Sequence, residues 1–177
     1  MVQDYSKMTF AELRNLKMQK MPREMLEKRI VALLESCNIC VLATSGENVP
    51  RATPIEYYSK GTTIYVLADP GTKVVNLKGN PRISVGIYNT PYTDWTDWPN
   101  VKGVQVTGKP TLIKDSEPEY REAMEVYKWV IYGTVAGRDL SGPPMGRTMV
   151  KIEARKIEYR DLGLLREGYL RFQVWEA

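Results

Sequence analysis

The apolar positions in the first fifth of the chain recur at helical spacing. Thr9 and Glu12 form the capping-box pattern with which many helices begin. Pro22 suits the first turn of a second helix, whose apolar positions continue until Cys37. We therefore expect residues 1–36 to form two short helices.

The apolar period changes to two after residue 38, which indicates strands. Strands are expected at 39–44, 51–58 and 63–67, and the intervening segments 45–48 and 59–62 have the glycine and polar residues of turns. Because the three strands follow one another with only short turns between them, the pattern predicts an antiparallel meander.

Two more strands are expected at 82–88 and 101–113. The connection between them, residues 89–100, is a long aromatic loop that carries Trp95 and Trp98. Such large rings pack a loop onto a protein core or form part of a binding surface, and the sequence leaves both interpretations open.

The remaining segments alternate between helix and strand signals. A short helix is expected at 72–78 and a longer one at 116–132. Residues 133–146 form a Gly/Pro-rich loop, which is either a plain connection or a lid over a substrate. Strands are expected at 147–159 and 169–175.

About six antiparallel strands with helices at the periphery favour a mainly β protein built on a small barrel. At 177 residues the chain can bury one solid core without metal or disulfide support. We expect a single domain over 1–177. Its parts are the N-terminal helices (1–36), the barrel core (38–113), the helix (116–132) and the C-terminal strands (147–175).

The chain contains no histidine, which excludes Ser-His-Asp hydrolysis and histidine-ligated zinc or haem. Its two cysteines, Cys37 and Cys40, form a C-x-x-C pair. Zinc would need two further soft ligands, and the chain offers none. The pair follows a helical pattern and leads into a strand, so we expect two buried structural thiols, with a redox pair as the alternative.

The net charge of +4 is spread along the chain. This is too diffuse for the basic stripe typical of nucleic-acid binding, although the many aromatic residues keep a single-strand-binding barrel as an alternative. The apolar runs are too short for a membrane span and the N-terminal segment is charged, so we expect no signal peptide, no membrane contact and a cytoplasmic location.

One group of residues has the chemistry of a phosphate site. Gly71, Thr72 and Lys73 begin a short helix, where free backbone N–H groups, a hydroxyl and an ammonium meet. In the strand beginning at Arg51, alternate side chains share a face, so Arg51 and Thr53 point the same way. The guanidinium can bind a phosphate through two hydrogen bonds, and Asn76 adds a neutral one.

At these residues the sequence resembles a known family, the FMN-binding split barrels related to pyridoxamine 5'-phosphate oxidase. The matching motifs are R-x-T-P at Arg51, G-T-K-x-x-N-L at Gly71, N-P-R-I-S-V at Asn80 and V-x-G-K-P at Val106. Their order and spacing within residues 40–113 carry the resemblance.

The resemblance implies a six-stranded split β-barrel of Greek-key type and a homodimer with FMN at the subunit interface. It also implies which residues hold the cofactor. By matching position, the phosphate is held by Arg51, Thr53, Thr72 and Lys73, with Asn76 nearby. The flavin then lies along the strand backbones at Ala52, Pro54, Tyr65 and Val66.

The sequence departs from the vitamin B6 oxidases at three points. Glu56 stands where those enzymes have a basic residue, Gly103 stands about where they have a flavin-contacting glutamine, and the histidine of their Arg-x-His pair is missing. We therefore expect an FMN-dependent oxidoreductase acting on a different small molecule, with no side chain named as catalytic. The alternatives are a flavin-binding or redox-sensing protein without turnover, and a deazaflavin-dependent reductase.

Overall fold

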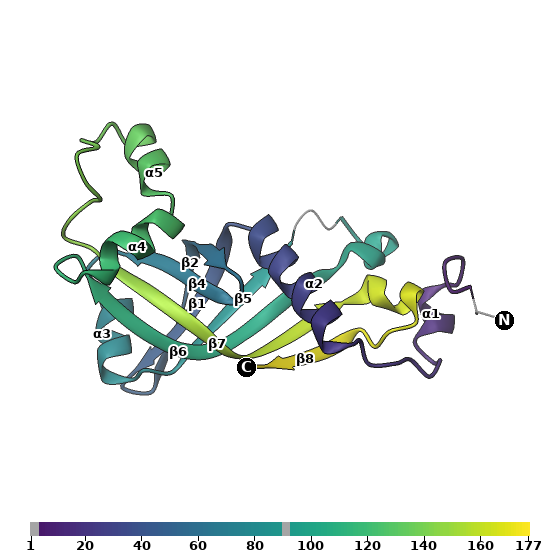
Figure 1. Cartoon of the computed structure of the whole chain (residues 1–177). Coiled ribbons are helices and arrows are strands. Elements are labelled where there is room, and N and C mark those ends of the chain that lie inside the picture. Colours follow the sequence, from purple (N-terminus) through teal and green to yellow (C-terminus); the bar gives the residue numbers. More distant parts are fainter. Residues whose placement is uncertain (1–3, 90–92) are drawn as a thin grey trace.

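The computed structural model describes residues 4–89 and 93–177 and contains one antiparallel sheet with helices around it (Figure 1). The strands are β1 (Ile39–Gly46), β2 (Val49–Glu56), β3 (Tyr58–Lys60), β4 (Thr63–Ala68), β5 (Ile83–Tyr88), β6 (Lys102–Lys114), β7 (Thr148–Asp161) and β8 (Phe172–Glu176). The α-helices are α1 (Phe10–Leu13), α2 (Arg23–Ser36), α3 (Thr72–Gly79), α4 (Glu119–Val126) and α5 (Trp129–Val135). Two short 3-10 helices, η1 (Trp95–Asn100) and η2 (Leu162–Glu167), complete the list.

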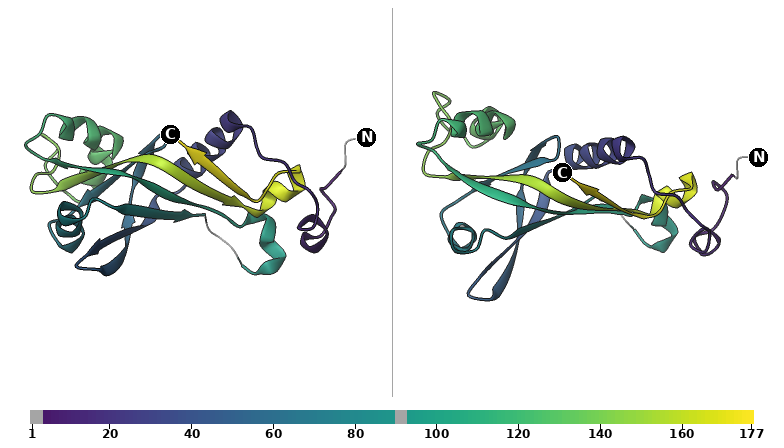
Figure 2. Two further views of the ribbon diagram at one scale, coloured as in Figure 1. Left: turned by 90° about the horizontal axis from the view of Figure 1, so that it is seen from below. Right: turned by 60° about the horizontal axis from the view of Figure 1, so that its bottom comes forward.

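The sheet confirms the mainly β, split-barrel class. Its strand order is β2-β1-β5-β6-β7-β4-β3, and β8 pairs with β7. The long strands β6 and β7 run side by side through the molecule (Figure 2), and β2 also contacts β4, so the sheet curls toward closure. The described residues form eight strands, two more than the six of the expected barrel and one more than the seven strand segments expected from the sequence, because the segment 51–58 is divided into β2 and β3.

The N-terminal helices follow the predicted signals. The Thr9 hydroxyl accepts a hydrogen bond from the Glu12 backbone N–H at 3.3 Å, and the Glu12 carboxylate accepts one from the Thr9 N–H at 2.7 Å. This capping box begins α1. The second helix, α2, has the predicted extent: it begins after Pro22 and ends before Cys37, and its buried side chains run from Leu26 to Leu34.

The predicted three-stranded meander is wrong. β1 and β2 form the expected hairpin, but β3 and β4 lie at the other end of the strand order, where β4 pairs with β7. The change occurs at Tyr57, which is fully buried. Its backbone N–H donates to the Asn38 carbonyl at 2.9 Å and its hydroxyl donates to the Leu34 carbonyl at 2.7 Å. Tyr57 is therefore anchored beside the end of α2, and the chain leaves the hairpin there.

The single helix expected at 116–132 is also wrong. α4 and α5 are separated at Lys128, whose φ of 56° lies in the left-handed region. The break lets Tyr127 and Trp129 both be buried, whereas a continuous helix would point residues two positions apart to nearly opposite sides. The Lys128 ammonium then lies 5.2 Å from the centre of the Tyr58 ring.

A β-bulge explains one glycine of the V-x-G-K-P motif. The pairing of β6 with β7 shifts between Thr107 and Gly108. A Cβ atom at Gly108 would collide with the Glu153 backbone carbonyl. Only glycine therefore allows the two longest strands to approach this closely at the bulge.

The core is divided into three clusters. The largest packs α2 and α3 against the sheet, and a second packs α4 against the Tyr65 side of β4. The third, which we call the tip cluster, joins Leu13, Trp98, Leu162 and Leu165 at the end of the molecule that carries α1. Trp98 contacts the Phe10 ring with centroids 5.1 Å apart, so this side chain packs its loop onto the protein, whereas Trp95 is exposed.

Both cysteines are free thiols. Cys40 is buried in the main core, while Cys37 at the end of α2 is half-buried. Burial raises the pKa of the Cys40 thiol to about 12, and the neighbouring Glu56 carboxylate acts in the same direction. In the described residues no group of three or more acidic or cysteine side chains could hold a metal ion. A structural role for Cys40 agrees with this environment.

No helix in the described part of the chain is long and apolar enough to cross a membrane.

We expect Tyr57→Phe to lower the free energy of unfolding by about 1–3 kcal/mol, because the buried Leu34 carbonyl at the end of α2 would lose its hydrogen-bond donor. Urea unfolding followed by circular dichroism measures the change. Tyr88→Phe is the matched control, since Tyr88 is 63% exposed. Equal stability of the two variants would contradict the role given to the Tyr57 hydroxyl.

We expect iodoacetamide at pH 8 to modify Cys37 well before Cys40 in the folded protein. The raised pKa keeps the Cys40 thiol protonated at that pH, and burial blocks access. Peptide mass spectrometry with time measures each site, and urea-unfolded protein is the control in which both sites react. Equal labelling rates in the folded state would show that Cys40 is accessible.

Candidate functional site

The hairpin β1–β2 and the helix α3 bring the predicted phosphate-binding residues together. Arg51 lies opposite Thr44 in the hairpin, so the two side chains share one face of the sheet. The Thr44 hydroxyl accepts a hydrogen bond at 3.2 Å from the side-chain amide of Asn76 on α3. This contact fixes α3 beside the face of the hairpin that carries Arg51.

A cavity of about 690 Å³ lies between the hairpin turn and α3. Arg51, Thr72 and Asn76 line it, together with the turn residues 45–50. Thr72 and Asn76 are four residues apart on α3 and therefore share one helical face. We call the three residues Arg51, Thr72 and Asn76 the cradle. The half-buried Lys73 is adjacent to Thr72 in sequence but is not among the residues that line the cavity.

The beginning of α3 supports an anion in the cradle. Gly71 caps the helix without a side chain, and its carbonyl accepts from the N–H groups of Val74 and Val75. The N–H groups of Thr72 and Lys73 belong to the first helical turn, which has no carbonyl partners within the helix. Together with the helix dipole they favour negative charge at this end.

Thr53 provides an independent sign of a missing polar partner. It is two residues beyond Arg51 in β2 and lies opposite the buried Leu42, so its side chain is on the same face. Its hydroxyl oxygen is buried and has no hydrogen-bond partner among the described residues. A buried hydroxyl without a partner is costly, and a polar ligand atom would satisfy it. The residues present therefore fit a phosphorylated group.

The four residues predicted to lie along the flavin do not line the cavity beside the cradle. Ala52 and Pro54 are exposed and lie on the opposite face of β2. Val66 of β4 is buried in the main core, and Tyr65 packs in the α4 cluster, so neither lines the cavity beside the cradle. Their strand nevertheless contacts β2, which leaves the backbones of the two predicted flavin-binding segments close to each other.

Two features of the cradle escaped the sequence analysis. Thr44 holds Asn76, and its signal is the buried alternation of β1, on which it falls. Gly46 is the second, because a Cβ atom there would collide with the Asn76 amide oxygen. A larger residue at this position would displace the Asn76 amide from its place beside Thr44. The sequence shows this glycine only as part of a turn.

Comparison with known proteins places these residues in context. The family model described as pyridoxamine 5'-phosphate oxidase matches residues 26–161. No curated protein sequence gives a significant match. Among solved structures, a putative pyridoxamine 5'-phosphate oxidase from Listeria innocua has a TM-score of 0.57 at 21% identity, with 78% of this chain and 98% of that chain covered.

Two further structures share the fold. A FAD-binding protein from Mesorhizobium loti has a TM-score of 0.56 at 18% identity, covering 73% of this chain and 88% of that one. The General Stress Protein 26 from Bacillus anthracis has a TM-score of 0.60 at 16% identity, with 86% and 98% covered. The family match extends over most of the sheet, α3 and the cradle, and on this basis the chain belongs to the pyridoxamine 5'-phosphate oxidase family.

Proposed function

We propose that this protein binds FMN noncovalently and is an oxidoreductase that uses the flavin to reduce or oxidise a small molecule. The observation that carries the proposal is the cradle, in which a guanidinium and a helix N-terminus meet beside the buried, unpartnered Thr53 hydroxyl. The family membership supports the same ligand.

In this proposal the cradle binds the FMN phosphate. Arg51 donates two hydrogen bonds to phosphate oxygens and supplies charge, while Thr72 and Thr53 donate hydroxyl hydrogen bonds. Lys73 adds an ammonium from the first turn of α3. Asn76 is held by Thr44 and keeps α3 at a fixed position relative to β2.

The flavin ring supplies hydride or electron transfer when it is bound, so the chain need only position it and exclude water. The ring would lie along the backbones of β2 at Ala52 and Pro54 and of β4 at Tyr65 and Val66. Strand backbones suit this role because their C=O groups, and their N–H groups except at Pro54, have fixed directions. We name no catalytic side chain.

The substrate differs from that of the vitamin B6 oxidases in this proposal. The chain has no histidine to contact a pyridoxamine phosphate, and the exposed carboxylate of Glu56 stands where those enzymes have a basic residue. One measurement distinguishes this oxidoreductase from the alternative, a protein that binds flavin without catalysing a reaction. An oxidoreductase accelerates oxidation of a reduced pyridine nucleotide by some acceptor, whereas a sensor is only reduced chemically.

FMN is favoured over longer flavins by the composition of the cradle. Among the described residues that line this cavity, Arg51 is the one cation, and a single phosphate monoester satisfies it and the α3 N-terminus together. The structural relative from Mesorhizobium loti is described as FAD-binding, and a deazaflavin has a longer anionic tail. FAD and a deazaflavin are therefore the alternatives to FMN that the test must distinguish. Extraction of the chromophore and its mass distinguish the three.

A second copy of the chain is proposed to complete the site. Ala52 and Pro54 are exposed in one copy, so a flavin lying along them would face solvent on its other side. A partner subunit covering that side would exclude water from the ring. We expect sedimentation velocity to give a dimer of about 40 kDa, since one chain has a mass of 20.2 kDa. A monomer in the presence of excess FMN would contradict the dimer but leave the cradle intact.

We expect the double variant Arg51→Ala/Lys73→Ala to purify colourless while the unchanged protein is yellow and releases FMN by mass. Loss of two charge-assisted contacts costs about 3 kcal/mol or more, roughly a 100-fold weakening. Visible absorbance and equilibrium dialysis with FMN measure the loss. The matched control is Lys78→Ala/Arg82→Ala, which removes two exposed cations near α3 that do not line the cavity. Stoichiometric FMN in the Arg51/Lys73 variant would sink the assignment.

A further inference from the structure

An ion pair between the ends of β4 and β7 holds the segment that leads into α3. β4 pairs with β7 as far as Ala68 and Thr148, and the next residue on each side, Asp69 and Arg147, continues this register. Nη1 of Arg147 lies 2.9 Å from Oδ1 of Asp69. Because α3 begins at Thr72, this ion pair comes three residues before the helix whose N-terminus supports an anion in the cradle.

Arg147 is held by other contacts as well. Its guanidinium carbon lies 5.8 Å from the centre of the Tyr132 ring of α5, and only 22% of its side chain is exposed. The preceding residue, Gly146, donates its backbone N–H to the Asp115 carboxylate at 2.5 Å. The Asp69 side chain, by contrast, is 64% exposed, and within the described residues Arg147 is its one polar side-chain partner. The arginine therefore fixes the position of the aspartate.

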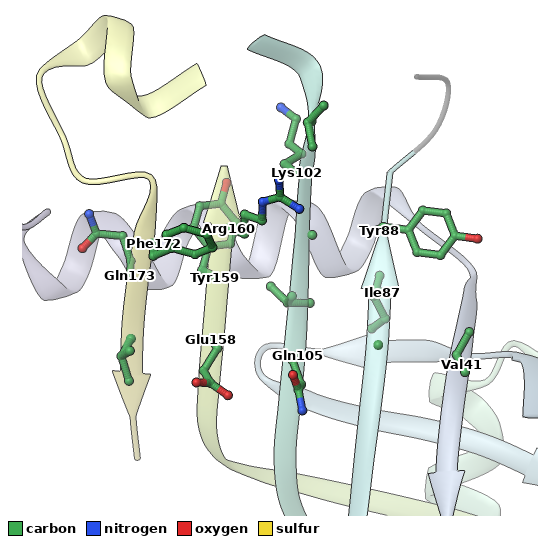
Figure 3. A pocket seen from close by; sticks show the side chains of 15 residues that line it. Val41, Ile87, Tyr88, Lys102, Gln105, Glu158, Tyr159, Arg160, Phe172 and Gln173 are labelled. Atoms are coloured by element: carbon green, nitrogen blue, oxygen red, sulfur yellow. The ribbon is translucent and has the colours of Figure 1, made fainter. Parts of the chain in front are cut away.

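The acidic partner distinguishes Arg147 from the arginine near the other end of β7. Figure 3 shows Arg160 reaching from β7 toward β6 and Lys102, and its guanidinium lies 5.8 Å from the centre of the Phe172 ring. In the part of the chain that the structure describes, no carboxylate forms an ion pair with Arg160. The ion pair of Arg147 therefore results from its place opposite Asp69 and is not general to arginines on this strand.

An unpaired Asp69 would compete for the N–H groups that α3 offers to an anion. Aspartate side chains accept hydrogen bonds from backbone N–H groups two residues on, and here that group belongs to Gly71. The N–H groups of Gly71, Thr72 and Lys73 have no acceptor among the described residues. The positive end of the helix dipole also attracts a carboxylate. A carboxylate in this position would repel a bound phosphate.

We propose that Arg147 is a positioning residue for phosphate binding, which acts by holding the Asp69 carboxylate away from the N-terminus of α3. The proposal rests on FMN binding at the cradle. Arg147 does not line the cavity there, so its effect passes through Asp69. While the ion pair is intact, the charge of Arg51 and the N-terminus of α3 are both free to bind the phosphate.

The test compares FMN affinity, measured by equilibrium dialysis, in four proteins: the unchanged chain, Arg147→Gln, Asp69→Asn and the double variant. We expect Arg147→Gln to weaken FMN binding about five-fold, the effect of one exposed charge at a helix end. Asp69→Asn alone should bind FMN at least as tightly as the unchanged chain, because it removes the competing carboxylate. For the same reason the double variant should recover the affinity lost in Arg147→Gln.

A purely structural ion pair gives a different pattern. Arg147→Gln and Asp69→Asn would then weaken FMN binding equally and the double variant would not recover, which would overturn the proposal. Unchanged affinity in Arg147→Gln would also overturn it. Arg147→Lys keeps the charge and should retain most of the affinity. Urea unfolding checks that each variant folds, as expected for an ion pair that is partly exposed to solvent.

The matched control is Arg29→Gln. This variant also removes one arginine from an ion pair, the one between Arg29 on α2 and Glu167 on η2, and neither residue lines the cavity at the cradle. It should leave FMN affinity unchanged. An equal loss in Arg29→Gln and Arg147→Gln would assign the effect to net charge and contradict the proposed role of Asp69.

A measurement on flavin-free, 15N-labelled protein separates failure of this proposal from failure of FMN binding. If the unchanged chain binds no FMN, the proposed function fails, and the amide resonances of Gly71 and Thr72 still report whether Asp69 reaches α3. We expect Asp69→Asn to shift these resonances more in the Arg147→Gln background than in the unchanged chain. Equal shifts in the two backgrounds would show that Arg147 does not restrain Asp69.

Discussion

The architecture depends on how the chain leaves the first hairpin at Tyr57. Burial of this ring and its two hydrogen bonds to the α2 end fix the point where the chain passes from one end of the sheet to the other. Because of this crossing, β2 and β4 come into contact although they are at separate places in the strand order. The cradle needs that arrangement, since α3 follows β4 directly and must return to the hairpin that carries Arg51.

Local signals predicted the helices and strands well because each depends on neighbouring residues. The Thr9 capping box, the buried alternation of β1 and the start of α3 are examples. The meander and the single helix at 116–132 failed for one shared reason. The pattern is interrupted at Tyr57 because this ring is buried against α2, and at Lys128 because its neighbours Tyr127 and Trp129 are both buried in the α4 cluster. Periodicity does not register contacts with elements distant in sequence.

The residues of the candidate site divide in the same way, into those that the local sequence predicts and those that depend on contacts between distant segments. The sequence named these residues from their chemistry and spacing, and the structure places Arg51, Thr72 and Asn76 around one cavity at the junction of β2 and α3. Thr53 lies two residues along β2 on the same face as Arg51, and neither it nor Lys73 lines the cavity. Thr44 and Gly46 were missed because their importance comes only from the position of Asn76 across the hairpin.

The buried tyrosines limit the stability of the folded protein at alkaline pH. Burial raises the pKa of the phenols of Tyr57 and Tyr159, and it raises that of Tyr127 to about 12. Each raised pKa means that the folded state holds its proton where an unfolded tyrosine, with a pKa near 10, releases it. The stability they contribute is complete below about pH 10 and is lost as the pH rises toward their folded values. The buried Cys40 thiol acts in the same direction: its pKa is raised to about 12, so the stability that it contributes begins to fall near pH 8.5, where an unfolded thiol releases its proton. A chain without histidine has no imidazole to titrate near neutrality, so these buried groups set the pH dependence of stability above the carboxylate range.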